Sequence, residues 1–156
     1  MTWADRLLRL AVGDPKREIA EPLVDIYRRL AAQAERLAAD AAQAPTAGAE
    51  QELRALAADD AAASAALGQA LHERGSPPAA PSAPVLNGAA RNHWARLVAC
   101  LETCRETRAQ LLRQSPRLLE LDPSLDGLLA SLLRGLDAEV QALRSLIARA
   151  DPQALD

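Results

Sequence analysis

The sequence predicts an all-α protein that forms one bundle of four long helices. Apolar residues recur at spacings of three and four along four long segments, which is the pattern of amphipathic helices. Short breaks rich in Pro and Gly separate these segments. The 156 residues are 49% hydrophobic but contain no Phe, so Leu and Ala must fill the interior. A chain of this length corresponds to one domain, and we therefore expect residues 1–156 to form a single helical-bundle domain.

The first expected element is a short extra N-terminal helix over residues 1–13. Trp3, Leu7 and Leu10 give this segment an apolar side, and charged residues occupy its opposite side. We expect this helix to cover one end of the bundle. A short amphipathic helix can also lie on a membrane surface, although the polar face of this one is not strongly basic.

The first helical hairpin is expected over residues 15–74, with helices at about Pro15–Gln43 and Ala47–Arg74. Asp14 and Thr46 precede the two helices and are residue types that cap a helix N-terminus by accepting a backbone N–H bond. Because the turn between the helices is short, we expect them to be antiparallel neighbours.

A Pro-rich connection follows over residues 75–88. Its four prolines lie between positions 77 and 84, where they prevent helix formation and favour an extended path. An extended chain covers about 3.1 Å per residue, so this connection can run along most of a helix. A shorter loop back would instead give a bundle whose consecutive helices alternate in direction.

The second hairpin is expected over residues 89–150. Its first helix should begin near Asn87 and end near Ser115, before Pro116, and Arg117 to Leu121 could form another helical turn. Its second helix should run from about Pro123 to Ala150 and carries the longest series of Leu residues. The sequence therefore predicts two antiparallel hairpins joined by one long connection.

Charge and hydropathy exclude several classes of partner. The net charge is −3 and the pI is about 5.4, which gives no general attraction to nucleic acid. No apolar run is long enough to span a membrane, and the charged start does not resemble a signal peptide. We therefore expect a cytoplasmic protein. Lys16 is the only lysine, and this bias and the excess of Ala are typical of a bacterial-like base composition.

Few residues suggest chemistry. Cys100 and Cys104 are four apart on one helix, and we expect reduced, buried thiols that act as small apolar groups. They could also contribute to a larger copper or zinc site. His93 is expected to face outward beside Trp94 in the core. We predict no catalytic residues and no cofactor.

Two charged residues fall on the apolar stripes. Asp60 lies on the stripe of the second long helix and Arg108 on that of the third. They are candidates for a buried polar pair, because a buried charge needs a partner. They could form a polar centre that anchors a ligand, or they could lie at the edge of the stripe and reach water.

The layout of two hairpins joined by a long connection resembles that of the ferritin-like, rubrerythrin-like superfamily. The resemblance implies a four-helix bundle in which two helices each supply a Glu and two supply Glu-x-x-His, and together they hold two metal ions. Here Ala63 stands three residues after Asp60, and Ala142 stands three after Glu139, so the histidines are missing. We therefore expect that the metal ligands are lost and that the bundle centre is inert aliphatic filling. Any remaining site would draw its ligands from Glu35, Asp60, Glu102, Glu106 and Glu139.

These observations favour a non-catalytic bundle that acts through protein contacts. It would associate with itself as a homodimer, or bind a protein partner that the sequence does not identify. The alternative is a diverged ferritin-like metal-binding oxidoreductase, or a binder of a small apolar ligand in a cavity lined by Leu.

Overall fold

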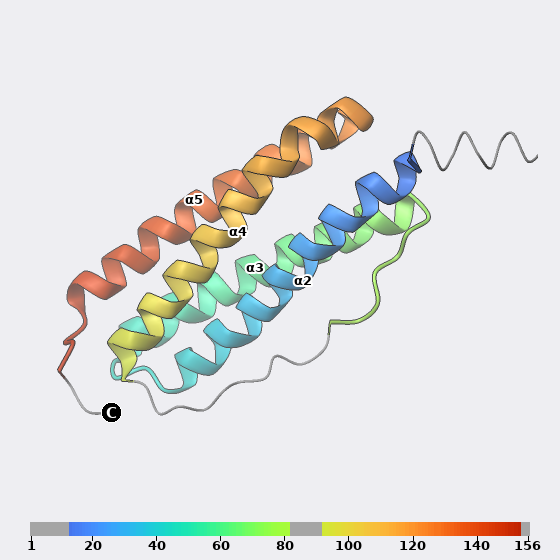
Figure 1. The fold of residues 1–156 in the computed structure, drawn as a ribbon. Coiled ribbons are helices and arrows are strands. Elements are labelled where there is room, and N and C mark those ends of the chain that lie inside the picture. Colours follow the sequence, from blue (N-terminus) through green and yellow to red (C-terminus); the bar gives the residue numbers. More distant parts are fainter. Residues whose placement is uncertain (1–12, 82–91, 154–156) are drawn as a thin grey trace, which may run out of the picture.

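The computed structural model describes residues 13–81 and 92–153, and four long helices dominate these ranges (Figure 1). Within them no strand occurs, and no helix is long and apolar enough to cross a membrane. Residues 1–12 of the predicted N-terminal helix, and the half of the Pro-rich connection that follows Pro81, lie outside the described residues. The helices are α2 (Pro15–Ala42), α3 (Ala47–Glu73), α4 (His93–Leu121) and α5 (Asp126–Arg149), with a 3-10 turn η1 (Pro123–Leu125) before α5.

The predicted boundaries of the first hairpin are confirmed by their caps. The Asp14 carboxylate accepts the Lys16 backbone N–H at 3.1 Å, and Thr46 Oγ1 accepts the N–H of Ala49 at 3.2 Å. Gly75 follows α3 with a φ of +72°, a conformation that glycine adopts without strain. Local sequence therefore fixes both helices of this hairpin.

The predicted end of α4 at Ser115 is wrong, because the helix continues through Pro116 to Leu121. Proline removes one backbone donor, so the carbonyl of Leu112 loses its helical partner. Pro116 and Leu112 are both exposed, and water can therefore satisfy this carbonyl. Ser115 Oγ donates to the Leu111 carbonyl at 2.7 Å within the same turn.

Two further boundaries differ from the prediction. The helix α4 begins at His93 and not at Asn87, because Asn92 has an extended backbone and its side chain accepts the Ala95 N–H at 2.9 Å. The last helix does not begin as an α-helix at Pro123, since a 3-10 turn precedes α5 there.

The described ends of the helices show how the two hairpins are connected. Arg74, after the end of α3, bonds to Asp122 at the end of α4 at 2.7 Å. Arg96, in the first turn of α4, donates to the carbonyl of Gln43 after α2 at 3.2 Å. The connection therefore joins opposite ends of the bundle, and α3 and α4 run in the same direction (Figure 1). A short loop back is excluded.

In cross-section the four helices lie at the corners of a square, and the extent of packing differs from one side to the next. The helix α2 packs extensively on α3 and α4, and α4 packs on α5, but α3 and α5 touch sparsely. On the α2–α3 side, Ser64 Oγ donates to the Tyr27 carbonyl at 3.1 Å. A Cβ at Gly68 would lie 3.3 Å from the Tyr27 ring, so the missing side chain permits close packing there. The core is mainly aliphatic, with Leu23, Ile26, Leu37, Leu53, Leu67, Leu97, Leu111 and Leu143 among its most buried members.

Candidate functional site

The centre of the bundle is polar, which corrects the prediction of inert aliphatic filling. Asp60 on α3 is 5% exposed and Glu139 on α5 is 4% exposed. Helical spacing places Asp60 in line with Ala57 and Ser64, which are also buried. Both carboxyl groups are therefore forced inward by the same period that buries the core.

Gln33 on α2 connects this carboxyl pair to α4. Its Nε2 donates to Glu139 Oε1 and to the Cys100 carbonyl, each at 3.1 Å. These two acceptors fix the orientation of the amide, because the reversed amide would place its oxygen against them. Gln33 Oε1 is then left without a hydrogen-bond partner.

The pKa values of the two carboxyl groups are both raised. In the part of the chain that the structure describes, no donor reaches the buried Oδ2 of Asp60. Burial raises the pKa of Asp60 well above its usual value, and the negative charge of Glu139 raises it further. Burial also raises the pKa of Glu139, although bonds from Gln33 and Asp60 oppose this effect. Two adjacent buried carboxylates repel each other, and this repulsion favours the protonated form of Asp60 beside Glu139.

The thiols of α4 line the same interior. Cys100 and Cys104 are free and buried, as predicted, with exposures of 0% and 1%. Burial and the nearby carboxylates raise the pKa of both thiols, so neither forms the nucleophilic thiolate near neutral pH. Cys100 Sγ donates to Asp40 at 3.3 Å, and Cys104 Sγ makes a weak bond to the Leu136 carbonyl at 3.7 Å.

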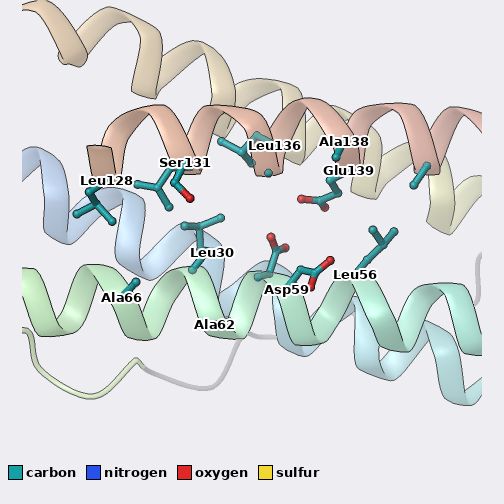
Figure 2. A pocket seen from close by; sticks show the side chains of 15 residues that line it. Leu30, Leu56, Asp59, Ala62, Ala66, Leu128, Ser131, Leu136, Ala138 and Glu139 are labelled. Atoms are coloured by element: carbon teal, nitrogen blue, oxygen red, sulfur yellow. The ribbon is translucent and has the colours of Figure 1, made fainter. Parts of the chain in front are cut away.

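A groove of about 500 Å³ opens between α3 and α5, directly over the carboxyl pair (Figure 2). Its existence follows from the sparse contact between these helices, where small residues replace large ones. Within residues 13–81 and 92–153, its charged lining residues are Asp59, Asp60 and Glu139, and none of the lining side chains is basic. The remaining walls are mostly apolar or small: Leu30, Leu56, Ala62, Ala63, Ala66, Leu128, Ser131, Leu132, Gly135, Leu136, Ala138 and Ala142.

The residues of the bundle centre do not fit the dinuclear metal site that the ferritin-like resemblance implies. Carboxyl groups from α3 and α5 are present, but Gln33 on α2 supplies a neutral amide. Ala63 and Ala142 line the groove at the positions where the motif requires histidine. Over the described ranges, no group of three or more His, Cys, Asp or Glu residues is arranged to hold a metal ion. The other candidates, Glu35, Glu102 and Glu106, are exposed.

The predicted pairing of Asp60 with Arg108 is wrong. Arg108 instead donates to Asp137 on the neighbouring helix α5, at the partly exposed α4–α5 edge. Asp60 lies on α3 and faces Glu139, which is an acidic residue like itself and not a basic one. The sequence interpretation missed Gln33 and the burial of Glu139. A signal was present, since Gln33 lies between Leu30 and Leu37 on the stripe of α2.

A second buried polar cluster lies between α2 and α4. The Asp40 carboxylate accepts from Cys100 and lies 3.5 Å from Arg96 Nε. Burial raises the pKa of Asp40, against the opposing effects of Cys100, Arg96 and Arg36. His93 is 6% exposed, so its predicted outward orientation is wrong. It shares a helical face with the buried Cys100, seven residues later.

Comparison with known proteins gives no match: no family model, no curated protein and no solved structure is similar to this chain. The geometry of the groove is therefore the main guide to function.

Proposed function

We propose that the protein is a non-catalytic helical bundle that binds a small molecule with an apolar body in the α3–α5 groove. The observation that carries this proposal is the open groove of about 500 Å³ between two helices that contact each other sparsely. Ligand sites are typically about 300–1,000 Å³, with mainly apolar walls and a few convergent polar groups. The Asp60–Glu139 pair supplies those polar groups at the base of the groove.

The chemistry of the lining supports binding more than catalysis. The described lining contains no imidazole that would activate the Ser131 hydroxyl, and neither cysteine belongs to it. The buried thiols are held in their protonated form. The groove therefore offers shape and negative charge, which are properties of a binding site.

We also propose that the fold is ferritin-like and that the protein acts in the cytoplasm. The order of directions, with α3 and α4 parallel and each hairpin antiparallel, supports this relationship (Figure 1). In this proposal the acidic positions of α3 and α5 have been retained while the histidines have been lost. The former metal centre would then have become the base of an organic ligand site.

Self-association is a second candidate function, and the exposed small residues beside the groove favour it. Ala62, Ala66, Gly135 and Ala138 are exposed and would allow a helix of a second copy to approach closely. Light scattering over a concentration series tests this candidate. A dimer that dissociates when Gly135 is replaced by Leu would support it, and a monomer at every concentration would exclude it.

Binding of the neutral, apolar dye N-phenylnaphthylamine tests the ligand function. We expect its fluorescence to rise with the wild-type protein and to fall in the Gly135→Leu variant, whose new side chain occupies the groove. A Cβ at Gly135 meets no atom within 4 Å, so this change should not disturb the fold. Gly127→Leu is the matched control, because Gly127 is an equally open position of α5 outside the groove. Absence of dye binding, or equal loss in both variants, would contradict the proposal.

A further inference from the structure

We propose that the α3–α5 groove selects an organic cation, with an ammonium or guanidinium head bound by Asp60 and Glu139 and an apolar body along the groove. This inference rests on the proposed ligand-binding function and names its chemical class. Three features of the groove carry it: the sign of its charges, the missing donor at Asp60, and the apolar walls above the acids.

The charges of the groove have one sign. Asp59, Asp60 and Glu139 contribute three carboxyl groups, and among the described residues no Arg, Lys or His lines the groove. Arginines are frequent elsewhere in this chain, and they pair with other acids: Arg108 with Asp137, and Arg149 with Glu52. The groove is therefore a place where acids stand without a basic partner, and an anionic ligand would be repelled from it.

The hydrogen bonding of the pair is incomplete in a way that a cation would complete. Asp60 is only 5% exposed and lines the groove, and its Oδ2 accepts no bond from any described donor. Glu139 receives a protein donor from Gln33. An ammonium or guanidinium group brings several N–H donors and a positive charge, which satisfy the free oxygen and offset the cost of burying the carboxylates.

The apolar walls determine the rest of the ligand. Figure 2 shows Leu30, Leu56 and Leu136 around the space in which Glu139 points toward α3. A small hydrated ion would leave these walls in contact with water, whereas an alkyl or aryl body would cover them. The combination therefore fits an amphipathic amine better than an inorganic ion.

Binding of such a cation should release a proton. The protonated amine keeps its own proton and binds between the two carboxyl groups. Asp60 then loses its proton to solvent. The titratable groups that face the pair are Asp59 on α3 and the thiols of Cys100 and Cys104 on α4. From α2 the pair receives the amide of Gln33, which does not titrate.

Isothermal titration calorimetry with octylamine and octanol tests the inference, because the two probes share an alkyl chain and differ in charge at neutral pH. We expect octylamine to bind about tenfold more tightly than octanol to the wild-type protein. The difference should disappear in Asp60→Asn, which keeps the shape of the side chain. Asp137→Asn is the matched control: it removes an acid of α5 outside the groove lining and should retain the preference. Titrations in phosphate and in Tris should give different apparent enthalpies for octylamine, which indicates proton release, and equal ones for octanol.

Four results separate the possible failures. Equal binding of octanol and octylamine would overturn the cation inference and leave the ligand function intact. A preference for octylamine over octanol that survives in Asp60→Asn would also overturn the inference. Stoichiometric binding of Mn²⁺ that is lost in Asp60→Asn, with no preference for octylamine, would assign the pair to a metal ion instead. If neither octanol nor octylamine bound, the proposed function itself would fail. A melting temperature of Asp60→Asn at or above the wild-type value shows that the variant is folded.

Discussion

Two buried aspartates of this bundle have opposite surroundings. Asp40, between α2 and α4, accepts from the Cys100 thiol and lies beside the Arg96 guanidinium. Asp60, beneath the α3–α5 groove, faces Glu139 and has one oxygen without a donor. Both are about equally buried, at 6% and 5% exposure. The difference shows that burial alone does not identify a functional acid; its partners and its access to a cavity do.

Replacement of Asp40 should have the largest effect on stability. Asp40→Leu removes the carboxylate beside Arg96, whose side chain is only 13% exposed, and leaves that cation in a poorly solvated position. We expect the free energy of unfolding to fall by about 2–3 kcal/mol. Urea denaturation measures this change. Glu35→Leu, at an exposed position of the same helix, is the control and should change stability by less than about 0.5 kcal/mol. Equal effects would remove the contrast between the two aspartates.

The matching change at Asp60 should have the opposite sign. In Asp60→Asn the side-chain amide can donate to the Glu139 carboxylate at any pH, because the amide does not titrate. We expect the free energy of unfolding to rise by about 1–2 kcal/mol at pH 8, because the cost of a buried acid pair is removed. Thermal and urea unfolding at this pH provide the measurement. A loss of stability would mean that the acid supports the fold in the same way as Asp40.

Because of the acid pair, the free energy of unfolding should also fall as the pH rises. The pKa of Asp60 and that of Glu139 are raised in the folded protein, so the folded state binds protons more strongly than the unfolded chain. Their contribution is complete below the unfolded pKa values, about 4, and is lost as pH rises through the folded values. We expect the free energy of unfolding to decline by about 1 kcal/mol or more between roughly pH 5 and pH 9.

The raised pKa of Asp40 adds to this decline, so the decline should become shallower in Asp60→Asn without vanishing. Urea titrations at a series of pH values measure both slopes. Identical slopes for the wild type and Asp60→Asn would show that the pair does not hold the proton.

The smallest expected effects compare the two sides of α3. Gly135 of α5 faces the open groove, and Gly135→Ala should raise the free energy of unfolding by about 0.5–1 kcal/mol through helix propensity. At Gly68 a new Cβ would lie 3.3 Å from the Tyr27 ring, so Gly68→Ala should gain less or lose stability. Thermal unfolding of both variants provides the comparison. An equal gain at both positions would indicate that the α2–α3 side is no more closely packed than the α3–α5 side.

Much of the fold follows from local sequence signals. The spacing of apolar residues predicts the four helices, and Asp14 and Thr46 act as the caps that their positions indicate. The length of the Pro-rich segment permits a connection along the bundle, but only the contacts of Arg74 with Asp122 and of Arg96 with Gln43 exclude a loop back. The continuation of α4 through Pro116 could not be predicted in the same way. The cost of a proline depends on whether the carbonyl that loses its hydrogen-bond donor is exposed to water.

The candidate site was predictable only in part. Asp60 could be found because it interrupts an apolar stripe. Its partner could not be found, because the relative heights of α3, α4 and α5 along the bundle axis determine whether Asp60 meets Arg108 or Glu139. These heights depend on long-range packing that no short window of sequence contains. The groove likewise arises from the spacing of two helices that are far apart in the chain.

The unequal sides of the square also have a mechanical consequence. The two hairpins adhere along the seam of α2 with α4, while the opposite seam of α3 with α5 is nearly free of contact. We expect a small rotation of one hairpin about the α2–α4 seam to widen the groove above Asp60 with the loss of few α3–α5 contacts. The width of the groove should therefore adjust to ligands of different size.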